Sequence, residues 1–133
     1  MKINSRNFLK SVPLLSRCII NSHFVAIDFE YSGILRSPFV DNSFNDFEEL
    51  RYWKNIQKID NYSPIQMGIS GFQFLPKSNI VNVFPFNIYL FPKFHHKNQD
   101  LRFNLETTQF LFETKFDFNT FFYQSIPFDP YMD

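Results

Sequence analysis

The sequence predicts an α/β protein in which helices flank a mixed β-sheet. Segments rich in β-forming residues alternate along the chain with segments whose apolar residues recur at helical spacing. Hydrophobic residues make up 44% of the 133 residues and Phe alone supplies 20, which is too apolar for a disordered chain. Because the length allows one domain at most, we expect a single packed core within residues 1–133.

The first 27 residues carry several basic side chains and no acidic one. Such a composition is typical of a mitochondrial transit peptide. It also fits an ordinary helix with a basic exposed face, which would begin after a cap at Asn4 or Ser5. The apolar residues at helical spacing in this helix are Leu14, Leu15, Cys18 and Ile19. We favour the helix, because a hydrophobic strand follows it with no linker.

Phe24–Glu30 is a short apolar run rich in β-formers and interrupted only by Asp28. Such a run predicts a buried central strand. Residues 31–45 contain Gly33, Pro38 and several polar residues, so a loop is expected there.

Asp46 is expected to cap the next helix, because Glu49 follows at the third helical position and completes a capping-box-like start. Leu50, Trp53 and Ile56 then recur at helical spacing. The helix should end near residues 59–61.

Two further strands are predicted at residues 64–74 and 80–91, with turn-forming residues 76–79 between them. This arrangement favours a β-hairpin. Pro85 lies inside the second strand, where it indicates either a bulge or a sheet edge, since proline has no N–H to donate.

A polar loop around residues 95–100 precedes two short predicted helices. Residues 106–113 favour a helix that presents Phe110 and Leu111. Asp117 is placed to cap a second helix, which carries Phe118, Phe121 and Phe122. This order of elements leaves the sheet unfinished at its C-terminal side.

Composition excludes several kinds of site. Thirteen Lys and Arg balance thirteen Asp and Glu, so no net charge points to a nucleic acid or a membrane. The three glycines form neither a GxGxxG nor a GxxxxGKS/T loop. The single Cys18 excludes an internal disulfide and a cysteine-rich zinc site, which fits a reducing compartment. No apolar run reaches the roughly 18 to 20 residues of a membrane span.

Asp28 and Glu30 are the most informative pair of residues. In a strand, residues two apart project from the same face, so the two carboxylates lie side by side. Two like charges are costly there unless a cation lies between them. Hard oxygen ligands suit Mg²⁺ or Mn²⁺, and two-metal phosphodiester hydrolysis fits such a face. The alternative is that both acids lie at a solvated strand end.

The stretch FVAIDFEYSGI (residues 24–34) resembles the first exonuclease motif of the DEDD superfamily, and specifically that of the poly(A)-specific ribonuclease family of deadenylases. Further segments resemble the family in the same order: SRNFLKSV near the start, PIQMGIS at 64–70, FNIYLFPK at 86–93 and FDFNTFFYQSIP at 116–127. The resemblance covers nearly the whole chain and corresponds to the N-terminal part of such a nuclease.

The resemblance implies an RNase H-like core with a five-stranded mixed sheet, two Mg²⁺ (or Mn²⁺) ions, and 3′-to-5′ removal of adenylates from poly(A) RNA in mRNA decay. It assigns Asp28 and Glu30 as the first two metal-binding, catalytic acids. The positions of Tyr31 and Ile34 lie near the substrate in the family, where they would line the pocket for the terminal adenine. Packing of these two residues within the loop is the alternative.

The departures from the family concern catalysis. Nothing after Glu30 matches the second-motif Asp or the third-motif His and Asp. His95 and His96 precede the FDFN segment, which is the wrong order for the third motif, so we interpret them as a surface loop. Lys115 and Ser125 stand where relatives usually have Gly, which puts two turns in question. We therefore expect a partial domain with poor or no nuclease activity alone: a gene fragment, a degenerate paralogue, or a piece that pairs with another chain.

Two residue classes allow a second interpretation. Basic residues could form a phosphate-contacting patch, although the interleaved Glu48 and Glu49 favour a solvated helix; these are Arg36, Arg51, Lys54 and Lys58. The 20 Phe could form a base-stacking surface, but most of them fall at core periods, so core packing is expected.

The leading hypothesis is the N-terminal portion of a 3′–5′ exoribonuclease that acts on poly(A) 3′ ends in the nucleus or the cytoplasm. The rival is a catalytically inactive module that binds RNA or dimerises, with itself or with a full-length relative. No membrane partner is expected. A third possibility is a remnant without function, whose open sheet edge and apolar faces would make it poorly soluble.

Overall fold

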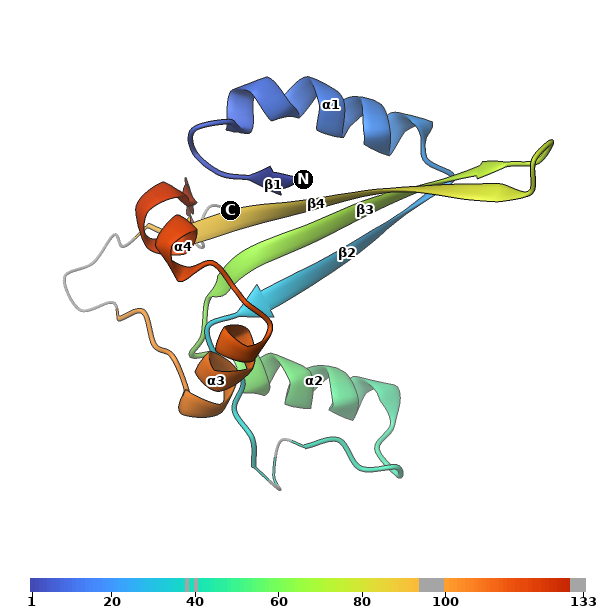
Figure 1. Ribbon diagram of the computed structural model, residues 1–133. Helices are drawn as coiled ribbons and strands as arrows, with labels where there is room; N and C mark the ends of the chain where they lie inside the picture. Colours follow the sequence, from blue (N-terminus) through green and yellow to red (C-terminus); the bar gives the residue numbers. More distant parts are fainter. Residues whose placement is uncertain (38, 40, 94–99, 130–133) are drawn as a thin grey trace. The chain divides into compact units, whose positions relative to one another are not determined.

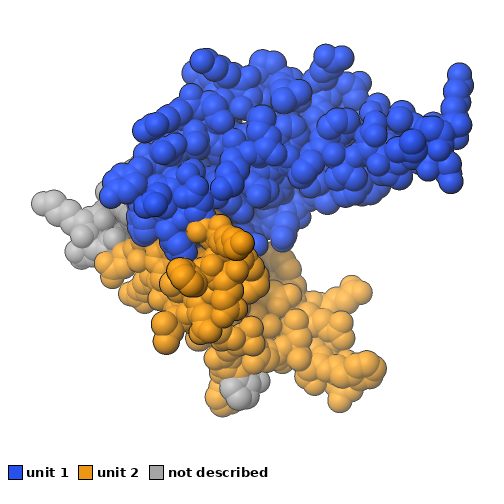
Figure 2. Space-filling model, viewed as in Figure 1, with its two compact units in different colours: residues 1–30, 64–93, 117–133 blue, residues 31–63, 94–116 orange. Residues whose placement is uncertain are grey.

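The computed structural model describes residues 1–37, 39, 41–93 and 100–129. The chain divides into two compact units (Figure 2): residues 1–30, 64–93 and 117–133 form unit 1, and residues 31–63 and 94–116 form unit 2. Unit 1 contains the β-sheet with two helices, and unit 2 contains two further helices with their loops.

Unit 1 is built on a five-stranded mixed sheet, with strand order β1-β4-β3-β2 and with β5 also paired to β4 (Figure 1). The strands are β1 (Lys2–Ile3), β2 (Phe24–Tyr31), β3 (Pro64–Leu75), β4 (Ile80–Pro92) and β5 (Ile126–Phe128). β4 runs antiparallel to β3 and parallel to β1 and β5. The predicted α/β class with a mixed sheet is confirmed.

The β3–β4 hairpin is continuous, as predicted. Its pairing runs without a break from Gln66 opposite Tyr89 to Leu75 opposite Ile80, so the bulge considered at Pro85 is absent. The edge interpretation of Pro85 holds instead. The Asn87 N–H points away from β3 and donates to Met1 O at 2.9 Å. The Pro85 nitrogen, two residues earlier, also points away from β3. β1 pairs with β4 only from Asn87 onward, so no strand residue faces the Pro85 nitrogen and its missing N–H costs no ladder hydrogen bond.

The core of unit 1 lies between the sheet and helix α1 (Phe8–Asn21). Its buried members are Ile3, Ile69, Phe86 and Ile88, against which Leu15 and Cys18 of α1 pack. The N-terminal segment is thus part of the fold, which supports the helix interpretation over the transit peptide.

The helix begins later than expected, because Asn7 rather than Asn4 or Ser5 holds its cap position. The Asn7 side chain accepts from the Asn4 N–H at 2.8 Å and donates to Lys2 O at 3.0 Å. These bonds close a turn between β1 and α1, so the first helical residue moves to Phe8.

Helix α4 (Phe118–Gln124) packs against the other face of β4. Side chains alternate between faces along a strand, so Phe91 points away from Phe86 and Ile88. The centroid of the Phe91 ring lies 5.4 Å from that of the fully buried Phe121. Asp117 caps this helix as predicted, since its carboxylate accepts from the Thr120 N–H at 2.9 Å. Hydrogen bonds from Thr120 hold the pKa of Asp117 below its usual value, and the Lys2 ammonium lowers it further.

The prediction of a buried central strand at residues 24–30 is wrong in placement, although a strand does form. β2 is the outermost strand in the described sheet, and Ile27 and Phe29 are 60% and 42% exposed. An apolar run identifies a strand but not what covers it.

The expectation that most Phe side chains are buried is also wrong. Phe86 and Phe121 are buried, whereas ten described Phe are exposed: Phe24, Phe29, Phe39, Phe44, Phe47, Phe74, Phe84, Phe110, Phe112 and Phe122.

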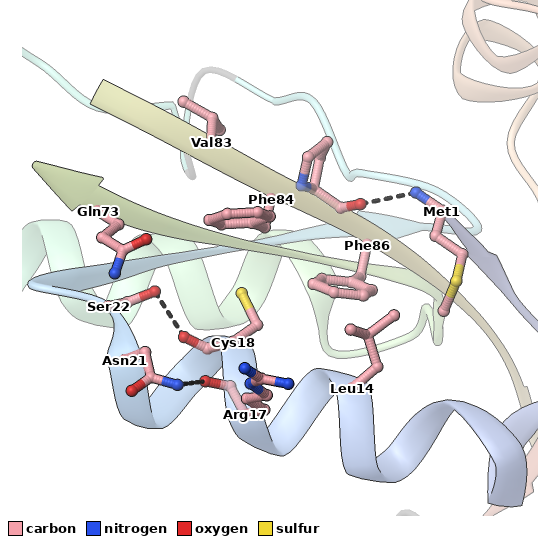
Figure 3. A pocket seen from close by; sticks show the side chains of 11 residues that line it. Met1, Leu14, Arg17, Cys18, Asn21, Ser22, Gln73, Val83, Phe84 and Phe86 are labelled. Carbon is pink, nitrogen blue, oxygen red and sulfur yellow. Dashed lines mark hydrogen bonds between the residues drawn. The ribbon is translucent and has the colours of Figure 1, made fainter. Parts of the chain in front are cut away.

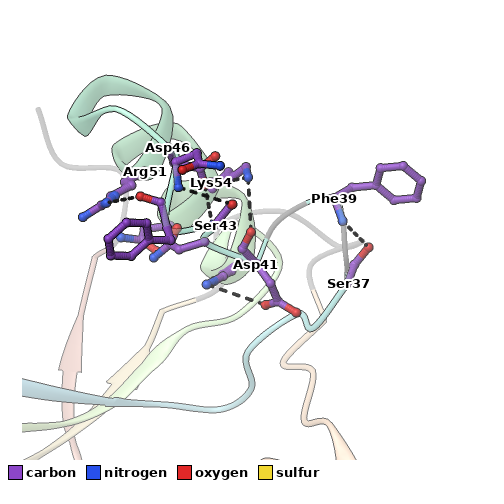
Figure 4. A network of polar contacts seen from close by, with 12 residues as sticks. Ser37, Phe39, Asp41, Ser43, Asp46, Arg51 and Lys54 are labelled. Atoms are coloured by element: carbon purple, nitrogen blue, oxygen red, sulfur yellow. Dashed lines mark hydrogen bonds and ion pairs between the residues drawn. The ribbon is translucent and has the colours of Figure 1, made fainter.

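Unit 2 contains helices α2 (Glu48–Ile59) and α3 (Leu105–Glu113). Helix α3 is capped by Asn104, whose side chain accepts from the Thr107 N–H at 2.8 Å, and it buries Leu111. The predicted Asp46 cap of α2 is wrong, because Phe47 holds that position without a side-chain bond. Asp46 instead accepts from the Ser43 N–H at 2.6 Å and from Lys54 Nζ at 2.7 Å (Figure 4). The Lys54 and Ser43 hydrogen bonds hold the pKa of Asp46 below its usual value.

The two turns that lack the family's glycines differ in what they require. Lys115 adopts a φ of 60°, the left-handed conformation that glycine would take without strain. Ser125 has a φ of −65° and needs no glycine, but its buried hydroxyl oxygen has no hydrogen-bond partner within the described chain.

Gly71 allows the C-terminal end of α1 to approach β3, and its replacement tests that contact. A Cβ at Gly71 would lie 2.5 Å from Cys18 Sγ and would also clash with Ser22 Oγ, whereas a Cβ at Gly68 meets its neighbours at 3.8–4.0 Å. We expect Gly71→Ala to lower the free energy of unfolding by about 1–3 kcal/mol. Gly68→Ala, the matched control, should be neutral or slightly stabilising. Urea unfolding of both variants measures this, and equal stabilities would contradict it.

Candidate functional site

Asp28 and Glu30 project from the face of the sheet that lies opposite α1. A Cβ at Gly71 would point at Cys18 of α1, whereas a Cβ at Gly68 would lie 3.9 Å from Asp28 Cβ. Residues 68 and 71 face opposite sides of β3, so Asp28 lies on the side away from the helix. Glu30, two residues further along β2, shares that side, as its spacing predicts.

The carboxylates of Asp28 and Glu30 interact electrostatically. Partial burial of Glu30 raises the pKa of its carboxyl above the usual value, and the negative charge of Asp28 raises it further. Asp28 itself is exposed. Within the described part of the chain, neither carboxylate is joined to a Lys or Arg. A proton or a cation between the two acids would therefore relieve their repulsion.

Asn87 extends this polar row and was missed by the reasoning from sequence. Its Oδ1 atom lies 4.0 Å from the Cβ position of Gly68, so Asp28 and Asn87 flank a glycine that places no side chain between them. The signal was the hairpin register, which sets Gly68 directly opposite Asn87. An amide oxygen on the same face is a further hard ligand of the kind that Mg²⁺ accepts.

The donor set fits one divalent cation better than two. Two carboxylates and an amide oxygen suit Mg²⁺ or Mn²⁺, which commonly use one or two protein carboxylates together with substrate phosphate. No group of three or more His, Cys, Asp or Glu residues suited to a metal occurs among the residues that the structure describes. His95 and His96 lie outside these residues.

Tyr31 and Ile34 belong to unit 2. The backbone next to them is held by Asn104, whose Nδ2 donates to Ile34 O at 2.6 Å and whose N–H donates to Ser32 O at 3.3 Å. The Ile34 side chain is 42% exposed and Tyr31 is half-buried. The adenine contact of these two side chains stays a prediction.

The four basic residues considered as a phosphate patch are engaged within unit 2. Lys54 pairs with Asp46, Lys58 lies 3.7 Å from Asp41, and Arg36 lies 3.2 Å from Glu106. Arg51 donates to Phe44 O at 3.3 Å (Figure 4). These contacts favour the solvated-helix interpretation over a free phosphate site.

The coupling of the two acids can be measured. Asp28→Asn is expected to lower the pKa of Glu30, because it removes the neighbouring negative charge while burial still acts. A raised pKa means that the folded state holds the Glu30 proton more tightly. Its stabilising effect is present below the ordinary Glu pKa and is lost as pH rises through the folded value. Asp28→Asn should therefore stabilise the protein more at pH 7 than at pH 4. Carboxyl NMR titration and urea unfolding test this, with Asp117→Asn as the control that should leave Glu30 unchanged.

Comparison with known proteins places this geometry in a family. Residues 3–131 match the family described as CAF1 family ribonuclease. The Poly(A)-specific ribonuclease PARN of Danio rerio is 30% identical over 133 residues, covering 96% of this chain and 20% of that protein. The Pre-piRNA 3′-exonuclease trimmer of Bombyx mori is 30% identical over 129 residues, covering 96% of this chain and 24% of that protein.

A solved structure of S. pombe Pop2p in its Mg²⁺- and Mn²⁺-bound form superposes with a TM-score of 0.63 at 19% identity, covering 94% of this chain and 47% of that one. This likeness confirms the expected RNase H-like fold. The chain spans only about a fifth to a quarter of the curated relatives above. The match over residues 3–131 shows that the chain belongs to the CAF1 family of ribonucleases.

Proposed function

We propose that this chain carries the first metal-binding acids of a 3′–5′ exoribonuclease that shortens poly(A) RNA. The observation that carries the proposal is the pair Asp28 and Glu30, coupled side by side on one face of the sheet of a CAF1-family chain. The name of the relative PARN supports poly(A) as the substrate, and the Mg²⁺ and Mn²⁺ of Pop2p support a divalent cation as the cofactor.

The residues of this chain have separate roles in the proposal. Asp28 and Glu30 would hold the cation, with Asn87 Oδ1 on the same face as a third oxygen. A bound Mg²⁺ or Mn²⁺ supplies Lewis acidity toward a phosphodiester and lowers the pKa of bound water. Tyr31 and Ile34 would contact the terminal adenine by stacking and apolar contact.

Residues 1–133 would form part of one nuclease domain rather than a whole one. Two carboxylates hold one cation loosely, and a water-activating base and further acids are needed for two-metal hydrolysis. These groups would come from additional polypeptide, on the same chain or on another. The nucleus and the cytoplasm both remain predictions for its location.

Metal binding can be tested without any activity. Mn²⁺ should broaden the NMR signals of Asp28, Glu30 and their neighbours on β2 and β3. Asp28→Ala should abolish this effect, and Asp117→Ala, which removes the carboxylate that caps α4, should leave it intact. Because the pKa of Glu30 is raised, Mn²⁺ should bind less tightly as pH falls toward that value. Broadening that persists in Asp28→Ala would contradict the assignment.

Activity is expected to be poor in this chain alone. Incubation with Mg²⁺ and an oligo(A) substrate should give little shortening, and Asp28→Ala should change it little. Robust shortening by the wild-type chain that disappears in Asp28→Ala would show that the chain needs no further acids, which would overturn the partial-domain proposal.

A dimerisation module is the second candidate, and the position of β2 favours it. As the outermost strand described, β2 presents unpaired backbone groups together with the exposed Ile27. Ile27→Lys should convert a dimer to a monomer in light scattering, because a charge on an edge strand disfavours strand pairing. Ile80→Lys, at an exposed site near the hairpin turn, is the control. A wild-type chain that is monomeric at all concentrations would exclude this candidate.

None of the helices in the described ranges has the length and hydropathy of a membrane span.

A further inference from the structure

A pocket of about 670 Å³ lies between the C-terminal half of α1 and the β3–β4 hairpin, entirely within unit 1 (Figure 3). Leu14, Arg17 and Cys18 line it from the helix, and Gln73, Val83 and Phe84 line it from the strands. It opens on the α1 side of the sheet, whereas Asp28 and Glu30 lie on the other face. The volume is that of a small-molecule site, with an apolar lining and a few polar groups.

The elements around this pocket carry positive charge only. Residues 1–27 and 64–92 contain no Asp or Glu, and their charged residues are Lys2, Arg6, Lys10, Arg17 and Lys77. Of these, Arg17 alone lines the pocket. Its guanidinium makes no hydrogen bond or ion pair within the described chain. A planar guanidinium with five donors suits a phosphate or a carboxylate.

The opposite wall of the pocket suits a flat aromatic ring. Phe84 lies opposite Gly71 in the hairpin, so its side chain faces α1, and it is 42% exposed, which leaves an accessible apolar ring surface. The Gln73 side chain, half-buried on the same face of the hairpin, has no hydrogen-bond partner among the described residues. A Gln amide presents one donor and one acceptor together, the pattern that pairs with N6 and N7 of adenine.

We propose that this pocket binds an adenine nucleotide, with the base on Phe84, the base edge at Gln73 and the phosphate at Arg17. The nucleotide has two sources with the same chemistry, a free mononucleotide or a residue of an RNA chain. The inference goes beyond the metal site, because it needs neither Asp28 nor a cation. It would give the chain an RNA contact on the face opposite the acids.

Cys18 provides a direct readout, because it is the only thiol in the chain and it lines the pocket. The experiment measures the rate of Cys18 alkylation by iodoacetamide with increasing AMP, adenosine, inorganic phosphate or oligo(A). A ligand present at about nine times its Kd should slow alkylation about tenfold by mass action. Chemical-shift changes of the Arg17 Nε–H and Gln73 side-chain amide provide a second readout that does not depend on thiol access.

Matched variants separate the pocket from general charge effects. Arg17→Gln should weaken AMP binding roughly tenfold, the loss expected for one charge-assisted hydrogen bond. Lys10→Gln removes the same charge from the same helix outside the pocket and should leave binding unchanged. Gln73→Met should abolish the preference for AMP over UMP.

The outcomes distinguish this inference from the proposed function. Protection by AMP that is weakened in Arg17→Gln and retained in Asp28→Ala supports the pocket whatever the fate of the metal site. Protection by oligo(A) as well identifies RNA as the source, and protection by AMP alone identifies the mononucleotide. The proposal is overturned if no nucleotide protects Cys18 or shifts the side-chain signals, if phosphate alone protects as well as AMP, or if adenosine does.

Discussion

The pairing of β4 on both of its edges is the constraint on which unit 1 depends. The β3 ladder occupies one edge, and β1 and β5 lie in line along the other, with Lys2 opposite Asn87 and Ile126 opposite Leu90. Segments more than 120 residues apart in sequence are thereby joined to one strand. Closing the loop from Lys2 to Asn87 and the loop from Leu90 to Ile126 costs chain entropy that these short strands alone do not offset. The buried contacts of Ile3 and Phe121 must supply the remainder.

The sequence predicts best where the signals are local. The hairpin follows from two β-rich runs and a turn, and α4 follows from Asp117, which has no stronger partner than the helix it caps. Asp46 was predicted to cap α2 on the same kind of evidence, but it does not, because Lys54 and Ser43 both donate to its carboxylate. β1 and β5 have two and three residues, too few to show a period, and exist only because β4 pairs with them.

The candidate site could be predicted in part. The spacing of Asp28 and Glu30 requires a shared face, but the pKa of Glu30 is raised first by its burial, which the spacing does not predict, and then by the Asp28 charge. Asn87 needed the hairpin register, since nothing near it in sequence points to Asp28. The pocket proposed for a nucleotide could not be predicted from sequence. It depends on the close approach of α1 to β3, which Gly71 allows at one end of the helix. The exposed Phe residues show the same limit: periodicity locates a face without saying what covers it.

The β3–β4 hairpin extends past the end of α1 (Figure 1), and its outer residues Phe74, Leu75, Ile80 and Val81 are exposed while Ile69 and Phe86 are buried. The backbone amides of this one ladder should therefore differ in their protection from hydrogen exchange. Near the core, backbone amides should exchange with solvent only on global unfolding, whereas those near Asn79 should exchange through small local openings. The hairpin would thus open first at its turn. Its amide exchange rates would show at which residue of each strand the protection by packing against α1 ends.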